Sequence, residues 1–344
     1  MSEAIKRQIA ADIAAFKPQI KISSPIHAAA LFKATLSEHP ELLAYVSGYS
    51  SSVSPISGMC VRMSYCNTDV PLSSVFTVRS RERIEDIIHR SISSFLSSVI
   101  IVAPKGVDVA SVYSEFSVAY NGFYSNLVEQ SYQSWTMESY GYTFFRLNFK
   151  YRIGKVKLIM MEREMKREID RLQKILFCEG MRPETKAYIA HNYLARSVEY
   201  WLKENPDPLE LSYRQSAYGA LINKKCVCQG YSEAFKRLLD SQGIENYVLC
   251  GKVKGSAVHH AWNAVTFNGS DFYHVDVTWD SQGGGLSSHR YFCKTDAEML
   301  PTRIWSRRPG VVCNSKTNIA TIAKEDIFRN KDRYTRAGVD KKYF

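Results

Sequence analysis

Residues 224–280 constrain the fold more than any other stretch, because one helix pattern and several strand patterns follow one another there. Apolar residues recur at the spacing of one helix face, at Tyr231, Ala234, Phe235, Leu238 and Leu239. Gly243 ends this helix. Three strand patterns follow, at 244–253, 259–267 and 271–279. Asn268-Gly269 lies between the last two and predicts a hairpin, so the stretch predicts an α+β arrangement.

Cys228 lies in the first turn of the predicted helix. The unpaired N–H groups and the positive end of the helix dipole favour a thiolate there, and the thiolate is the nucleophilic form of cysteine. Lys224 and Lys225 add positive charge just before it, which we expect to favour the thiolate further. Taken alone, a cysteine at a helix start is more often a buried apolar residue.

The predicted hairpin brings His260 roughly opposite Asp276. A carboxylate beside an imidazole fixes its tautomer and stabilises the imidazolium that forms when the histidine takes a thiol proton. Cys228, His260 and Asp276 therefore make a candidate catalytic triad of nucleophile, base and orienting carboxylate.

Three segments carry a resemblance to a known family: VCQGYSEAF, HHAWNAV and FYHVDVTWD. In this order they resemble the signature blocks of bacterial transglutaminase-like domains, members of the papain-like cysteine fold. The resemblance runs from about Met181 to about Trp305. It implies a transglutaminase core with the nucleophile helix packed on an antiparallel sheet, acyl transfer through a thioester, and no metal or organic cofactor. By motif position it assigns the nucleophile to Cys228.

Other residues near the three blocks compete for the same roles. Cys226 stands where family members commonly carry glycine or another small residue, so a second thiol lies close to Cys228. His259 and His260 alternate along a strand, so only one of them can face the thiol, and the motif favours His260. His274 shares a face with the orienting carboxylate and has either a structural or a functional role. Two further residues could be taken for the orienting group, Asn263 and Asp280.

The oxyanion that forms during attack on an amide needs hydrogen-bond donors that are already in place. The backbone N–H of Cys228 can supply one of them. The second donor stays open, with three polar candidates close to the helix start: Tyr218, Gln215 and Gln229. Trp262 resembles the family's tryptophan after the histidine, which implies that it shapes the substrate cleft.

The chain is long enough for more than one domain. We expect an α+β scaffold or recognition domain at 1–160, a transglutaminase-like cysteine catalytic domain at 161–310, and a basic tail at 311–344. Between residues 28 and 177 the pattern of helix, two strands and helix occurs twice, which indicates a possible internal repeat of roughly 80 residues.

Composition excludes several classes of protein. No apolar run approaches the roughly 20 residues that span a bilayer, and residues 1–16 do not resemble a secretory signal, so we expect a soluble, cytoplasmic protein. The eight cysteines are widely and irregularly spaced, which argues against a disulfide scaffold. Cys226-Val-Cys228 is too tight for the usual zinc pairing, so no metal site is expected.

The formal net charge of +11 is concentrated near the end of the chain, where residues 301–344 hold 11 basic and 4 acidic residues. Such a segment can attract nucleic acid. No nucleic-acid motif accompanies it, so a solvated basic end is the better interpretation.

These observations favour a protein or peptide substrate and hydrolysis of the acyl-enzyme, as in a peptidase or deamidase. Two alternatives stay open: a true transglutaminase that transfers the acyl group to an amine, and a peptide- or wall-fragment-binding protein with an idle triad. The sequence does not predict the oligomeric state.

Overall fold

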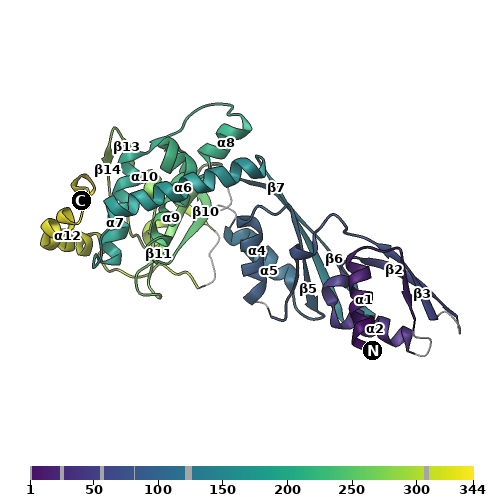
Figure 1. The fold of residues 1–344 in the computed structure, drawn as a ribbon. Helices are drawn as coiled ribbons and strands as arrows, with labels where there is room; N and C mark the ends of the chain where they lie inside the picture. The colour runs from purple at the N-terminus through teal and green to yellow at the C-terminus, as the bar shows by residue number, and fades with distance from the viewer. Residues whose placement is uncertain (1, 24–26, 55–57, 81, 121–125, 306–309) are drawn as a thin grey trace. The chain divides into compact units, whose positions relative to one another are not determined.

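A computed structural model describes residues 2–23, 27–54, 58–80, 82–120, 126–305 and 310–344 (Figure 1). The chain divides into two compact units, Met1–Glu115 with Glu129–Lys150 and Phe116–Val128 with Tyr151–Phe344. The long helix α6 (Lys155–Leu176) lies wholly in the second unit, whereas the border expected at residue 160 would cut it. Among the described residues, no helix has both the length and the apolar character needed to cross a membrane.

Most elements of the first 151 residues form two groups with the same order: helix, strand, helix, strand, strand. The first group contains α1 (Ser2–Ala14), β1 (Gln19–Ile22), α2 (Ala28–Glu38), β2 (Val46–Ser54) and β3 (Gly58–Tyr65), with α3 (Pro40–Leu43) before β2. The second contains α4 (Glu82–Ser93), β5 (Ser98–Pro104), α5 (Val109–Tyr120), β6 (Leu127–Met137) and β7 (Tyr142–Tyr151). In each group, the strand that comes last in the chain lies between the other two in the sheet, in the orders β1-β3-β2 and β5-β7-β6. Strand β4 (Val75–Thr77) pairs with β5.

The first helix of each group also ends in the same way. Phe16 and Phe95 both have a left-handed backbone, with φ of 53° in each. The N–H of Phe16 donates to the carbonyl of Ile13, and that of Phe95 donates to the carbonyl of Ile92, both at 2.9 Å. Such left-handed closures satisfy the last carbonyls of a helix. Element order, strand order and helix closure therefore all occur twice, roughly 80 residues apart.

The second unit holds the stretch from which the sequence analysis began. After α6 come α7 (Pro183–Ser197), β8 (Glu199–Tyr200), α8 (Pro208–Arg214), a π-helical turn (Gly219–Asn223), β9 (Lys225–Cys226), α9 (Cys228–Asp240), β10 (Asn246–Val253), β11 (His259–Thr266) and β12 (Phe272–Val275). The chain continues through α10 (Val277–Asp280), β13 (Ser281–Gly283), β14 (Leu286–Ser287), α11 (Asp296–Met299), β15 (Arg303–Trp305) and α12 (Ile319–Arg336).

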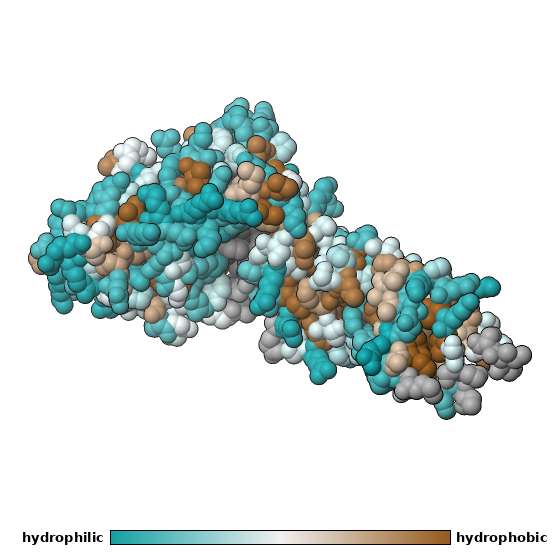
Figure 2. All heavy atoms as spheres, viewed as in Figure 1, coloured by the Kyte–Doolittle hydropathy of each residue, from teal (hydrophilic) through white to brown (hydrophobic). Residues whose placement is uncertain are grey.

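A four-stranded antiparallel sheet of order β12-β11-β10-β15 is the centre of this unit. Helix α9 packs on it, because its apolar face joins the same core as the strands, with Phe235, Leu238, Val265 and Val275 buried together. The helix on an antiparallel sheet and the α+β class are therefore as the sequence predicted. Helix α6 turns an apolar face to this core and presents a largely hydrophilic face outward (Figure 2).

Residues 311–344, which we expected to form a separate basic tail, instead belong to the second unit. Helix α12 lies beside α7 (Figure 1) and buries one apolar stripe in the same core, made by Ile319, Ala323, Ile327 and Tyr334. The carboxylate of Asp326 also accepts hydrogen bonds from Thr185 of α7 and from Tyr334, both at 2.6 Å. The expectation was wrong because the high positive charge of the segment obscured the helical spacing of these apolar residues.

One predicted strand and one helix end at turns that the spacing of apolar residues does not mark. The strand predicted at 271–279 stops at Val275, because Asp276 caps α10 by accepting the N–H of Trp279 at 3.2 Å. Helix α7 ends at Ser197, where the chain turns into the short strand β8. Helix caps and short parallel pairings leave little trace in the periodicity of apolar residues.

Strands β10 and β15 approach closely at Gly251, which pairs with Trp305. A Cβ atom at Gly251 would lie 2.2 Å from the carbonyl oxygen of Ile304 and 2.8 Å from the Cη2 atom of Trp262. Only glycine therefore fits here, and this approach fixes the position of β15.

We expect Gly251→Ala to lower the free energy of unfolding by about 1–3 kcal/mol, because the added methyl group overpacks the contact between β10 and β15. Urea unfolding followed by circular dichroism measures this change. Gly154→Ala is the matched control, since its Cβ would meet no atom within 4 Å and its cost at a helix N-cap stays below about 1 kcal/mol. Equal stability of the two variants would contradict the close approach.

Candidate active site

Cys228 is the first residue of α9 and is partly exposed. Strand β9 brings the chain to it, and the N–H of Val227 donates to the carbonyl of Arg214 at 2.9 Å, which fixes the helix entry. The first N–H groups of a helix have no partner within it, and Cys228 stands at that end of α9.

Cys226 differs from Cys228 in its surroundings. It is completely buried, and it packs so closely on Gly230 that a Cβ there would lie 2.5 Å from the Cys226 Cβ. Burial raises the pKa of the Cys226 thiol well above its usual value. Of the two thiols, Cys228 is thus the one that a substrate can reach.

His260 lies between Cys228 and Asp276. Its Nε2 atom is 2.7 Å from Oδ2 of Asp276, and the imidazole also hydrogen-bonds with Cys228, for which Nδ1 remains. Burial disfavours a charged imidazole, but the hydrogen bonds to Asp276 and Cys228 outweigh this effect and raise the pKa of His260 to about 9. The structure brings the three predicted triad residues together, with the histidine in its imidazolium form at neutral pH.

Asp276 is completely buried, and its carboxylate accepts from three groups. Oδ1 accepts the N–H of Trp279 at 3.2 Å, whereas Oδ2 accepts both from His260 and from Nη2 of Arg303, each at 2.7 Å. Sequence reasoning missed Arg303 because it was counted with the basic residues near the chain end. Only a general signal was available in the sequence, because a buried carboxylate such as Asp276 needs a buried cation as its partner.

The other predicted charges near the nucleophile have different partners. The Nζ atom of Lys224 hydrogen-bonds with the hydroxyl of Tyr193 at 2.6 Å and with Glu168 at 3.3 Å. The Nζ atom of Lys225 lies over the ring of Trp201, 4.7 Å from its centre. Neither contact directs a charge at Cys228, whereas the imidazole of His260 hydrogen-bonds with the thiol.

The structure separates the candidates for the second oxyanion donor. The indole N–H of Trp262 donates to Nδ1 of His274 at 3.0 Å, and the hydroxyl of Tyr218 donates to Glu164. Oε1 of Gln215 accepts from Arg152 at 3.0 Å. Gln229 follows the nucleophile in the first turn of α9.

His274 belongs to a second buried pair, with its Nε2 atom 2.8 Å from Oδ1 of Asp296. Ligand atoms of His274, Asp296 and Cys313 lie within 4.8 Å of one another, as in a metal site. The indole N–H of Trp262 can only donate, so Nδ1 of His274 must accept and Nε2 must carry the proton. A protonated Nε2 cannot bind a metal ion. The pair instead holds Trp262, whose ring stacks on His260 with centroids 5.7 Å apart.

The remaining alternatives have structural partners elsewhere. His259 is exposed at the start of β11. The side-chain amide of Asn263 donates to the carbonyl of Ser232 on α9 at 3.0 Å, and Asp280 pairs with His191 at 3.0 Å. None of these contacts involves Cys228.

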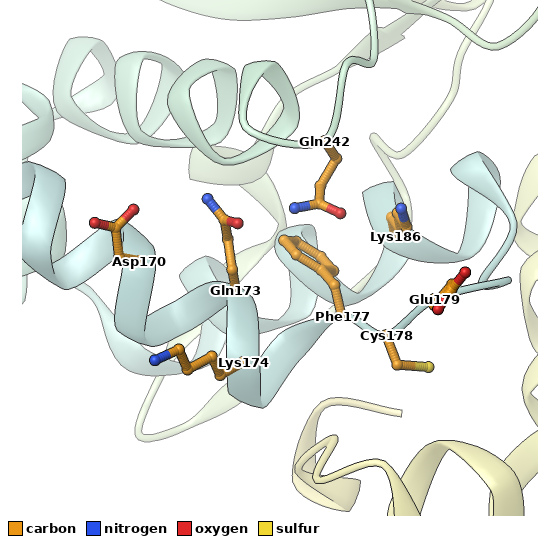
Figure 3. A pocket seen from close by; sticks show the side chains of 8 residues that line it. All are labelled: Asp170, Gln173, Lys174, Phe177, Cys178, Glu179, Lys186 and Gln242. Carbon is orange, nitrogen blue, oxygen red and sulfur yellow. The ribbon is translucent and has the colours of Figure 1, made fainter.

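A surface pocket of about 650 Å³ lies elsewhere in the second unit (Figure 3). Its lining contains Asp170, Gln173, Lys174, Phe177, Cys178, Glu179, Lys186 and Gln242. The lining contains two acidic and two basic side chains, so its charge favours neither anionic nor cationic ligands. No residue of the candidate triad lines this pocket.

A thiol at a helix start, beside a histidine that is hydrogen-bonded to a carboxylate, defines the class of cysteine-based catalytic folds. Residues 177–277 match the family model of the transglutaminase-like superfamily, and the chain thus contains a domain of this superfamily. The match includes Cys228, His260 and Asp276.

No curated protein matches the chain. Among solved structures, it is similar to a protein described as a candidate cysteine protease from Cytophaga hutchinsonii, with 12% identity, a TM-score of 0.27, and coverage of 47% of this chain and 68% of that one. It is also similar to a structure described as a TGase, with 14% identity, a TM-score of 0.30, and coverage of 83% and 81%.

The raised pKa of His260 predicts how alkylation of Cys228 depends on pH. Below about 9 the imidazolium attracts the anionic reagent iodoacetate, and above this pH the attraction is lost. We therefore expect the ratio of iodoacetate to iodoacetamide rates at Cys228 to fall as pH rises through about 9. Mass spectrometry of the Cys228 peptide gives both rates, and Cys226→Ala should leave the ratio unchanged. A ratio that stays constant with pH would contradict the imidazolium.

Proposed function

We propose that the protein catalyses acyl transfer from peptide or glutamine amides through a thioester on Cys228. The observation that carries this proposal is the position of His260, which contacts both Cys228 and the buried carboxylate of Asp276. The superfamily match supports a cysteine-based catalytic family. Cys228 is the nucleophile, His260 the proton carrier and Asp276 the orienting group.

The first half of the reaction needs one attack and one proton transfer. The Cys228 thiolate attacks the amide carbon, and the carbonyl electrons move to oxygen, where the N–H groups at the start of α9 stabilise the charge. The C–N bond then breaks, and the imidazolium of His260 gives its proton to the leaving nitrogen. The products are a thioester and ammonia or an amine.

In the second half, His260 is neutral and acts as a base. It takes a proton from water as the oxygen attacks the thioester carbon, the C–S bond breaks, and the thiolate and imidazolium return. Water is the acceptor that we favour, because it needs no dedicated binding channel. The reaction is then that of a peptidase or a deamidase.

The test is to incubate wild type and Cys228→Ala with a glutamine-containing casein digest and a fluorescent primary amine. Ammonia release reports hydrolysis of glutamine side-chain amides, and new peptide termini report hydrolysis of peptide bonds. Both are detected by mass spectrometry. We expect one of these products with wild type and a loss of at least about 10³-fold in Cys228→Ala, since the nucleophile is removed.

Cys226→Ala is the matched control and should retain activity, because its thiol is buried beside Gly230. Incorporation of the amine, lost in Cys228→Ala, would instead assign a true transglutaminase. If wild type forms no product and Cys228 reacts with iodoacetamide no faster than an ordinary thiol, the proposal is wrong, and a binding protein with an idle triad takes its place.

Trp262→Phe tests the assignment of the oxyanion donors. Because the indole N–H already donates to His274, we expect turnover of the substrate found above to fall less than about tenfold, whereas loss of a true donor costs about 10²–10³-fold. Tyr218→Phe should behave likewise, since its hydroxyl donates to Glu164. A loss above about 100-fold in either variant would reassign that residue as a donor.

A further inference from the structure

Arg303 is a completely buried arginine on β15 that reaches the candidate active site. Its Nη2 atom donates to Oδ2 of Asp276 at 2.7 Å. The centre of its guanidinium lies 3.8 Å from the ring centre of Trp279 and 5.2 Å from that of Tyr291. Pairing of β15 with β10, where Arg303 stands opposite Val253, sets this position.

The contacts of Arg303 favour orientation over stability. A stacked guanidinium with one strong ion pair has few ways to move. Its Nε atom is buried and has no hydrogen-bond partner within the described part of the chain. An unsatisfied buried donor costs about 1–3 kcal/mol, so the residue is not arranged for the most stable core.

The two side-chain partners of Asp276, His260 and Arg303, share one oxygen atom, Oδ2. The carboxylate cannot rotate, because its other oxygen holds the N–H of Trp279. The guanidinium on the same oxygen repels the nearby imidazolium, so the imidazolium is stabilised less than Asp276 alone would stabilise it. Arg303 therefore limits how strongly the site stabilises the imidazolium of His260.

We propose that Arg303 is a positioning residue of the candidate triad, which fixes Asp276 toward His260 and weakens the hold of the imidazolium on its proton. This role rests on the proposed acyl transfer, in which His260 must release that proton to the leaving nitrogen. A histidine bound to an unshared buried carboxylate would form the thiolate readily but would donate the proton poorly.

The sign of the effect follows from the charge of the buried group. When His260 loses its proton, the pair with Asp276 changes from neutral to anionic, and the guanidinium stabilises the anionic state. Removing the positive charge should therefore raise the pH at which the imidazolium is lost. Among the described residues, Cys228 from α9, His274 from β12 and Tyr200 from β8 also interact electrostatically with the pair, and the substitutions below leave them in place.

The experiment follows alkylation of Cys228 in three variants, Arg303→Gln, Arg303→Met and Arg303→Lys. In the two neutral variants, the pH at which the ratio of iodoacetate to iodoacetamide rates falls should rise by about one unit. In Arg303→Lys, which retains the charge, it should stay near the wild-type value. Because alkylation needs no substrate, failure of the acyl-transfer assay and failure of this proposal are distinguishable.

Arg237→Met is the matched control, since it also breaks a close arginine–carboxylate pair, with Glu162 at 2.7 Å, but on the later turns of α9. It should lower the stability of the fold without changing the pH at which the ratio of iodoacetate to iodoacetamide rates falls. An unchanged midpoint in a folded neutral variant, or an equal rise in Arg303→Lys, would overturn the proposal. If both neutral variants fail to fold while Arg303→Lys folds, the ion pair serves folding alone, and the proposal is likewise overturned.

Discussion

The fully buried carboxylate of Asp276 is the group on which the arrangement of this domain depends. A carboxylate taken out of water is very costly unless it is paired and hydrogen-bonded, and each partner of Asp276 comes from a different element. His260 comes from β11, Arg303 from β15 and the N–H of Trp279 from α10. The hairpin, the edge strand and the short helix must therefore all be in place before this charge is compensated.

A second layer of paired groups supports the first. His274 accepts the indole N–H of Trp262, and Asp296 hydrogen-bonds with the other ring nitrogen of His274. This pair holds the ring of Trp262 against His260. Burial lowers the pKa of His274, although Asp296 opposes this effect, so this histidine is the neutral acceptor that the indole needs. His260 has the opposite charge state and is protonated at neutral pH, because its pKa is raised to about 9. Two histidines, each beside an aspartate, thus differ in charge according to what contacts their other nitrogen atom.

Local pattern was enough to predict the parts of the site that depend on one element or one hairpin. The helix spacing placed Cys228 at the start of α9, and Asn268-Gly269 brought His260 near Asp276. The same reasoning extended the strand through Asp276, because capping of α10 by that side chain leaves no periodic signal. The family resemblance added the preference for Cys228 over Cys226, which burial of Cys226 then explains physically.

Contacts between elements that lie far apart in the chain could not be predicted from the sequence. Arg303 meets Asp276 only because β15 pairs with β10 across the sheet, and nothing in the local pattern of residues 301–305 indicates that pairing. The stripe of α12 could have been found from Ile319, Ala323 and Ile327, but its partner α7 could not. Positive charge was a poor guide in both cases, because it describes a segment's average and not the side on which each residue lies.

The proton of His260 links the charge balance of the site to its proposed chemistry. A histidine whose pKa is about 9 already holds a proton before a substrate arrives. The later step has the opposite requirement, since the same proton must leave for the nitrogen of the broken bond. Asp276 favours the first state, and Arg303, by sharing Oδ2, favours the second. A site with the carboxylate alone would suit only half of the reaction, which gives a chemical reason for a second cation on an oxygen that already has one.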